Sequence, residues 1–367
     1  MSVNATTVSA GEALRVLEAG WAAQTTGGLV ASWMLHGRPG VGKTEVVQTL
    51  AARIGAELFD LRLTTIEPQD LRGLPYFDHA SAKTIWYRPE DLPDTDAPAI
   101  LFLDELTAVV PALQPTVYGL LQERRVGRHR LPGSVMIVAA GNRVEDGAIA
   151  YDMGTALSDR LIHMIVQASP EDWLTSYALP AGIHPAVAAF IRTRPDLLET
   201  TEDSLRRGQM IACTPRSWTR VSKIIQTVAD RTLRQVMIAG TVGAAPAAEF
   251  ALLADEIAAS VQIDAMLAAP RRARAAMYPR SLHGLTALVY GLLGAVRRDN
   301  LGVAIELLAD LRGLSGPGFA GLPVQELASF GFEMLIGRAL ERGWESGFAE
   351  SPDYAAYAAE RQAAGLP

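Results

Sequence analysis

The chain has 367 residues, a hydrophobic share of 49% and a net charge of −7. Its length suggests two or three domains, its composition excludes a disordered chain, and its negative balance disfavours a general nucleic-acid binder. The single cysteine, Cys213, excludes an internal disulfide and is typical of a reducing compartment.

The N-terminal part predicts a helix followed by a buried strand. Ser9 and Glu12 form a capping-box pattern, from which we expect a helix to about Gly20. Glycines 27–28 interrupt the chain, and the apolar stretch 32–36 then predicts a strand. The strand leads directly into the most informative motif of the sequence.

Residues 37–44 match the phosphate-binding pattern G-x-x-x-x-G-K-[ST] at every fixed position. Glycines allow the tight turn that points several backbone N–H groups at one anion, and residues 43–54 predict a helix whose N-terminus faces the same anion. We therefore expect a triphosphate and Mg²⁺ to bind here. The loop residues expected to bind them are Gly37, Pro39, Gly40, Val41, Gly42, Lys43 and Thr44.

Further apolar stretches alternate with helical patterns, which is typical of a parallel sheet wrapped by helices. The predicted strands cover residues 57–63, 99–103, 134–140 and 161–166, with a helix over 111–123. With the strand before the loop they make a five-stranded parallel sheet in an αβα core. A hairpin is predicted from 74–77 and 84–87, between the second and third strands.

Polar side chains follow two of these strands. Asp104 and Glu105 end the strand over 99–103, and Asn142 follows the strand over 134–140. Two carboxylates at the end of a buried strand are costly unless they have partners. We expect Asp104 to hold Mg²⁺ together with Thr44, Glu105 to polarise the attacking water, and Asn142 to orient water or the γ-phosphate. The alternatives without a catalytic role are an ordinary acidic strand terminus for the two carboxylates and an ordinary turn asparagine for Asn142.

Strand patterns stop near Pro170, and helices follow. We divide the chain into an αβα core that holds the phosphate loop (1–168), a helical lid (169–239) and a helical C-terminal extension (240–367). In the lid, Thr214 suits a helix N-cap and Pro215 the first helical position. Arg216 then lies in the first helical turn, where a cation is unfavourable unless a phosphate faces it.

The order and spacing of residues 37–44, 101–105 and 141–142 resemble AAA+ ATPases. Residues 156–160 and 214–218 resemble the arginine-finger and sensor-2 segments of the MoxR branch, nearest to the group of CbbQ and NorQ-type proteins. Residues 64–90 resemble the branch's helix-2 insert and residues 124–133 its hairpin before sensor 1. The resemblance covers roughly residues 10–235.

The resemblance implies rings, usually hexamers, with ATP at the subunit joints. Arg160 then reaches the neighbour's γ-phosphate, while Arg216 senses nucleotide from the lid. It also implies remodelling or activation of a protein client, commonly with a von Willebrand factor A domain protein. Arg143, Arg124 and Arg125 are weaker finger candidates, and pairing of Arg160 with a surface acid is the alternative.

Two exposed-looking segments leave alternatives open. Aromatic residues of the predicted hairpin either grip a client or close their own hairpin; they are Tyr76, Phe77, Trp86 and Tyr87. The basic run 124–130 is expected to be a solvated loop or subunit contact, with DNA binding as the alternative. The run 271–274 is expected to be an exposed helix edge, and the six histidines show no metal-binding spacing.

No signal peptide is predicted, because the N-terminus lacks an apolar h-region. No membrane span is predicted, because the longest apolar run, 285–296, is short and broken by glycine. We expect a soluble cytoplasmic protein. Besides a client-remodelling ring, two functions stay open: a DNA-associated AAA+ motor or loader, and a nucleotide-dependent scaffold whose hydrolysis is incidental. A small-molecule kinase is disfavoured, because Glu105, Asn142 and Arg160 suit water attack between subunits.

Overall fold

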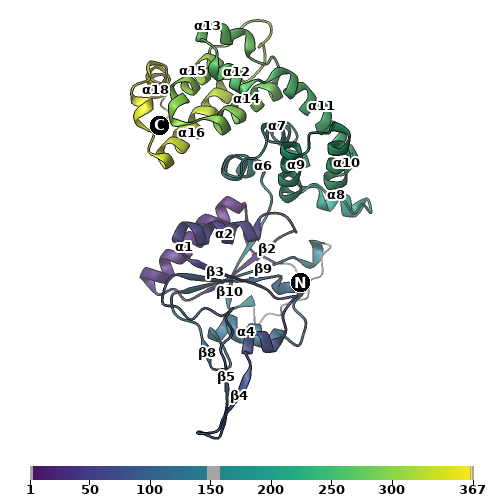
Figure 1. Ribbon diagram of the computed structural model, residues 1–367, viewed down its shortest axis with the longest axis vertical. Coiled ribbons are helices and arrows are strands. Elements are labelled where there is room, and N and C mark those ends of the chain that lie inside the picture. Colours follow the sequence, from purple (N-terminus) through teal and green to yellow (C-terminus); the bar gives the residue numbers. More distant parts are fainter. Residues whose placement is uncertain (1–2, 147–157, 364, 366–367) are drawn as a thin grey trace. The chain divides into compact units, whose positions relative to one another are not determined.

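The computed structural model describes residues 3–146, 158–363 and 365. The chain divides into two compact units, one of residues 1–169 with 201–210 and one of residues 170–200 with 211–367. The first unit holds an α/β sandwich and the second is helical (Figure 1). The lid and extension boundaries at 168/169 and 239/240 stay predictions.

The first unit is built on a six-stranded parallel sheet with the order β1-β10-β2-β9-β6-β3. Its strands are β1 (Thr7–Val8), β2 (Ser32–His36), β3 (Glu57–Arg62), β6 (Ala99–Asp104), β9 (Val135–Gly141) and β10 (Leu161–Val166). The five predicted strands are present. The sequence did not predict β1, which has only two residues and pairs with β10 alone at the sheet edge.

Helices cover both faces of this sheet (Figure 1). The helices of the unit are α1 (Ala10–Gly27), α2 (Lys43–Ile54), α3 (Pro68–Arg72), α4 (Gln114–Glu123) and α8 (Thr201–Arg206), with short 3₁₀ turns at Leu106–Ala108 and Val144–Asp146. Side chains alternate along each strand, so Leu35 joins the core under α1 and α2 while Met34 joins the core under α4. Both faces are buried, which explains the unbroken apolar strands.

The end predicted for the first helix near Gly20 is wrong, because α1 continues to Gly27 and Gly28 caps it. Gly20 is a packing residue: a Cβ atom there would lie 2.2 Å from the Trp33 ring. The predicted Ser9–Glu12 capping box is confirmed. Gly20 therefore lies inside the helix and allows it to pack closely against the sheet, and it does not end the helix.

Two small hairpins extend the core. The first pairs β4 (Pro75–Asp78) with β5 (Lys83–Trp86) and points away from the sheet (Figure 1). The second pairs β7 (Arg125–Val126) with β8 (His129–Arg130). Both lie where hairpins are expected from the sequence or from the family resemblance.

The second unit contains helices only, among the residues described. Its α-helices are α6 (Pro170–Asp172), α7 (Pro185–Thr193), α9 (Pro215–Thr227), α10 (Arg231–Val242), α11 (Ala244–Ser260), α12 (Ile263–Ala268), α13 (Arg271–Arg274), α14 (Leu282–Ala295), α15 (Leu301–Arg312), α16 (Val324–Arg342), α17 (Ser346–Ala349) and α18 (Pro352–Ala363). A π-helical turn covers Trp173–Tyr177, and 3₁₀ turns cover Pro195–Leu197, Ala275–Met277 and Arg298–Asn300.

The second unit packs on two apolar clusters. Phe190, Trp218 and Phe250 form an aromatic cluster between α7, α9 and α11, with ring centroids 5.1–5.8 Å apart. Helices α14, α15 and α16 form the larger core further along the chain. Within the described residues, no helix combines the length and apolarity that crossing a bilayer requires.

Candidate functional site

The candidate site lies at the carboxyl edge of the sheet in the first unit. Strands β2, β9, β6 and β3 are neighbours and run parallel, so their carboxyl ends meet at one edge. The loop 37–44 follows β2, Asn142 follows β9, and Asp104 ends β6. Residues far apart in the sequence are thereby brought together, as expected.

Glycines make the turn of the loop 37–44 possible. A Cβ atom on Gly37 would lie 2.4 Å from the carbonyl oxygen of Val166, so the neighbouring strand leaves no space for a side chain. Gly42 has φ +106° and caps the N-terminus of α2. The helix therefore starts with its free N–H groups and its positive dipole end at the loop.

The ammonium group of Lys43 is held among oxygen atoms of this edge. Its Nζ donates to the carbonyl oxygens of Gly37 at 2.5 Å and Arg38 at 3.0 Å, and to Asn142 Oδ1 at 3.2 Å. The side chain is buried. An anion entering the loop can replace these neutral acceptors with charged oxygens, which form stronger hydrogen bonds.

The two carboxylates occupy the adjoining strand end. Asp104 is the last residue of β6 and pairs in register with Arg62 of β3. Its Oδ1 accepts a hydrogen bond from the backbone N–H of Glu105 at 2.9 Å. Glu105 has φ +61°, a left-handed conformation that is uncommon for a residue with a side chain. The backbone therefore turns sharply here and separates the directions of the two carboxylates.

Thr64 and Arg62 hold the Glu105 carboxylate, and the sequence analysis did not identify either. Thr64 Oγ1 donates a hydrogen bond to Glu105 Oε2, and Arg62 Nε lies 3.8 Å from Oε1. Thr64 comes two residues after the end of β3. Its place after a predicted strand was the feature of the sequence from which it could have been recognised as a site residue. The candidate water-polarising group thus has a fixed orientation.

A buried acid, Asp146, organises the loop after Asn142. Its side chain is fully buried and accepts hydrogen bonds from the backbone N–H of Arg143 at 2.8 Å and from Arg143 Nη2 at 2.7 Å. Arg38 Nε lies 3.6 Å from the same carboxylate, and Arg38 Nη2 donates to Glu202 of α8 at 2.8 Å. Arg143, a weaker finger candidate, is therefore engaged inside its own chain.

Arg160 is exposed in the turn before β10, and residues 156–157 of the expected finger segment lie outside the described residues. Arg216 belongs to the second unit and is exposed in the first turn of α9. The predicted cap of that helix is confirmed, because Thr214 Oγ1 accepts from Ser217 N at 3.1 Å. The nucleotide-related roles of Arg160 and Arg216 stay predictions.

The basic run 124–130 forms the β7–β8 hairpin and turns partly inward. Arg124 Nη2 donates to the carbonyl oxygen of Pro132 at 3.1 Å, and its burial lowers the pKa of its guanidinium. Arg125 Nε pairs with Glu123 at 2.5 Å. Both weaker finger candidates therefore have partners within the chain, and only part of the run is a solvated loop.

The aromatic residues of the β4–β5 hairpin divide between its own packing and the solvent. Tyr76 and Tyr87 stack with centroids 4.3 Å apart, and Arg72 lies 4.3 Å above the Trp86 ring. The Phe77 side chain is 78% exposed, and Leu74 beside the same hairpin is 70% exposed. Tyr76, Tyr87 and Trp86 thus pack within the hairpin, whereas Phe77 faces the solvent.

The run 271–274 was expected to be an exposed helix edge, and residues 271–273 are exposed as predicted. The prediction is wrong for Arg274, which is buried and donates to Glu306 of α15 at 2.6 Å, while the exposed Arg271 pairs with Asp310 and Asp353. Cys213 is buried, and this burial raises the pKa of its thiol to about 11.

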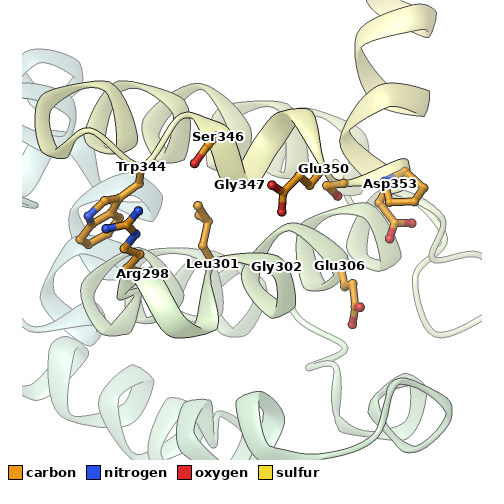
Figure 2. A pocket seen from close by; sticks show the side chains of 11 residues that line it. Arg298, Leu301, Gly302, Glu306, Trp344, Ser346, Gly347, Glu350 and Asp353 are labelled. Atoms are coloured by element: carbon orange, nitrogen blue, oxygen red, sulfur yellow. The ribbon is translucent and has the colours of Figure 1, made fainter.

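A recess of about 530 Å³ lies beside these ion pairs in the second unit. Trp344 and Arg298 lie at one end, and Glu350 and Asp353 lie toward the other (Figure 2). Sequence reasoning found no motif here. Glu306 and Asp353 line the recess but already have arginine partners, so its acidic lining serves the packing of the bundle.

Among the described residues, no group of three or more His, Cys, Asp or Glu side chains is placed to hold a metal ion. Mg²⁺ bound beside a nucleotide needs no such group, because phosphates and one or two protein oxygens hold it together. Thr44 and Asp104 supply such hard oxygen atoms.

Strand order, phosphate loop and carboxylate pair together define a P-loop αβα core. Residues 32–161 match the family model of an AAA domain of the dynein-related subfamily. One curated relative, the ATPase family gene 2 protein homolog B of Mus musculus, is 34% identical over 104 residues, which are 28% of this chain and 12% of that protein. The chain thus spans a small part of that relative.

Two solved structures overlap more of the chain at low similarity. A point mutant of RuvB from Thermotoga maritima is 16% identical, covers 79% of this chain and 83% of its own, and has a TM-score of 0.40. NtrX from Brucella abortus in complex with ADP is 15% identical, covers 89% and 68%, and has a TM-score of 0.31. The similarity to an AAA domain is carried by the match of residues 32–161.

Proposed function

We propose that this protein hydrolyses ATP with Mg²⁺ in a ring of identical subunits and uses the energy to remodel or activate a protein partner. One observation carries the proposal: Lys43 Nζ lies 3.2 Å from Asn142 Oδ1, at the strand edge that also ends in Asp104. A loop for phosphates, a cation, a polar amide and acids thus converge on one place.

The side chains at this edge divide the work of phosphoryl transfer. Loop N–H groups and Lys43 bind the phosphates, and Asn142 orients the γ-phosphate or the attacking water. Thr44 and Asp104 hold Mg²⁺, which supplies charge neutralisation when bound. Glu105, oriented by Thr64, accepts the hydrogen bond of the attacking water and polarises it.

The ring completes each site from the neighbouring subunit. Arg160 is exposed, and we propose that it reaches the γ-phosphate of the next subunit's ATP in a hexamer, with Arg216 contributing from the lid. An arginine finger supplies on the order of 10³–10⁵ in rate, so an isolated subunit is expected to be nearly inactive. With one cysteine in the chain, we expect the ring to work in the cytoplasm.

A protein client is proposed from two features. Residues 156–160 and 214–218 resemble segments of the MoxR branch and its CbbQ and NorQ-type group, whose members commonly work with a von Willebrand factor A domain protein, and this resemblance supports a protein partner. The exposed Phe77 at the β4–β5 hairpin offers an apolar contact for such a partner. Phe77→Ser is then expected to weaken client stimulation while leaving basal ATP turnover unchanged.

The decisive experiment compares Lys43→Ala with Glu105→Gln. Lys43→Ala is expected to abolish nucleotide binding. Glu105→Gln is expected to bind ATP normally and to lose turnover, so that an ATP-held ring can be isolated from native extract with its client. Normal ATP hydrolysis by Glu105→Gln would refute the role assigned to Glu105. If that variant still supports the function of the client in full, the protein is a nucleotide-dependent scaffold whose hydrolysis is incidental.

The alternative is a DNA-associated motor, supported by Arg128 and Arg130, which are exposed on the β7–β8 hairpin. Arg124 and Arg125 have partners inside the chain, and the net charge is −7, so this alternative is weaker. It predicts that duplex DNA stimulates turnover and that the stimulation falls steeply with salt.

A further inference from the structure

Two histidines that the proposed chemistry leaves unused lie directly behind the site. His36 is the last residue of β2, immediately before Gly37, and is almost fully buried. His163 lies on β10, in register with Met34. Since side chains alternate along a strand, His36 and His163 project from the same face of the sheet.

These histidines connect the phosphate loop with the turn that carries Arg160. His36 Nε2 lies 2.8 Å from His163 Nδ1, and the two rings are nearly parallel, with an interplanar angle of 14°. His163 Nε2 lies 2.9 Å from the carbonyl oxygen of Ser158. The second contact closes the turn 158–163, within which Arg160 lies.

When both rings are neutral, their partners determine the tautomer of each ring. A carbonyl oxygen only accepts hydrogen bonds, so His163 must carry its proton on Nε2. A neutral His163 then accepts at Nδ1, and His36 must donate from Nε2. One directional chain of hydrogen bonds thus runs from His36 through His163 to the backbone of Ser158.

We propose that His163 is a positioning residue, which fixes the turn bearing Arg160 and, through His36, ties that turn to the phosphate loop of the same chain. The inference rests on the proposed function, in which Arg160 completes the neighbour's site. A finger acts only when its guanidinium is placed closely, and a displacement of about 1 Å can cost on the order of 10²-fold in rate. The exposed Arg160 gains its placement from the hydrogen-bonded histidine pair behind it.

Two substitutions separate the two contacts of His163. The amide of His163→Asn can accept from His36 but is too short to reach Ser158, whereas the longer His163→Gln can donate to Ser158. We expect His163→Asn to lose turnover by on the order of 10²-fold. We expect His163→Gln to stay within about threefold of the parent, and both variants to keep the parent's ADP affinity, which a general loss of structure would lower.

Mixed rings test whether the defect lies in the finger. His163→Asn chains keep an intact phosphate loop, and Lys43→Ala chains keep an intact finger, so mixing the two inactive proteins should restore turnover at the joints where they meet. Arg160→Ala mixed with Lys43→Ala is the matched control, because it lacks only the finger itself. Restored turnover in both mixtures supports the inference.

Three results would overturn it. His163→Asn with turnover within twofold of the parent would show that the turn needs no such bond. Restored turnover only in the Arg160→Ala mixture would mean that His163 acts on its own phosphate loop, while the proposed ring function survives. No restoration in the Arg160→Ala mixture would refute the shared site itself, and the role of His163 would fall with it.

Discussion

Thr64 donates a hydrogen bond to the carboxylate of Glu105, although 41 residues separate them in the sequence. The contact exists because β3 and β6 are paired in register, so the residues after each strand meet at one edge. The pairing of β3 with β6 therefore determines where the Glu105 carboxylate, the candidate water-polarising group, lies.

Removal of the Thr64 hydroxyl should slow the proposed hydrolysis without weakening nucleotide binding. Thr64→Val keeps the shape of the side chain, but it frees the Glu105 carboxylate to rotate away from the attacking water. We expect a loss in kcat of about tenfold at an unchanged ATP Kd. Phosphate-release kinetics and fluorescent nucleotide titration measure both, with Thr64→Ser as the control. Faster turnover in Thr64→Val would show that Thr64 restrains Glu105 instead.

His36 should make the folded state less stable in mild acid. Burial first, and then His163, Arg143 and Lys43, lower the pKa of His36 from 6.5 to about 4, with Asp146 acting in the opposite direction. Between these values the unfolded chain binds a proton that the folded chain does not, so stability falls as the pH falls from about 6.5 toward 4.

The measurement compares the parent with His36→Gln, which keeps a donor for His163 but does not titrate. Between pH 7.5 and 5.0 the parent should lose about 2 kcal/mol more unfolding free energy than the variant in urea titrations. Equal losses in the two proteins would mean that His36 titrates normally in the folded state.

Gly141 should tolerate no side chain. A Cβ atom there would lie 2.5 Å from Thr107 Oγ1 and 3.0 Å from Met34 Cε, inside a packed core. We expect Gly141→Ala to destabilise the protein by about 1–3 kcal/mol. Adding Thr107→Ala should recover most of the loss, because it removes the colliding atoms and a buried hydroxyl that finds no hydrogen-bond partner among the described residues. An additive double variant would contradict this account.

Arg274 should contribute to the stability of the second unit. Arg274→Met leaves Glu306, whose side chain is 35% exposed, without its partner. The partial exposure limits the cost, and we expect a loss of about 2–3 kcal/mol in unfolding free energy. The neighbouring Arg272 is exposed, so Arg272→Met serves as the matched control and should change stability by less than about 0.5 kcal/mol. Equal effects in chemical denaturation would refute the structural role of the buried pair.

The sequence by itself determined the features that depend on neighbouring residues. The phosphate loop, the cap at Thr214 and the five main strands follow from short-range spacing, because a turn, a cap or an alternating strand is specified within a few residues. The acids at the end of β6 were also recognisable, since their strand is apolar throughout.

The tertiary structure alone decided which distant residues meet. Gly20 was misread as a helix end because its role depends on the Trp33 ring, and Arg274 was misread as exposed because Glu306 lies on another helix. The bond between His36 and His163 likewise required β10 to lie beside β2. Side-chain pairs of this kind depend on strand order and helix packing, which the pattern of a single segment does not contain.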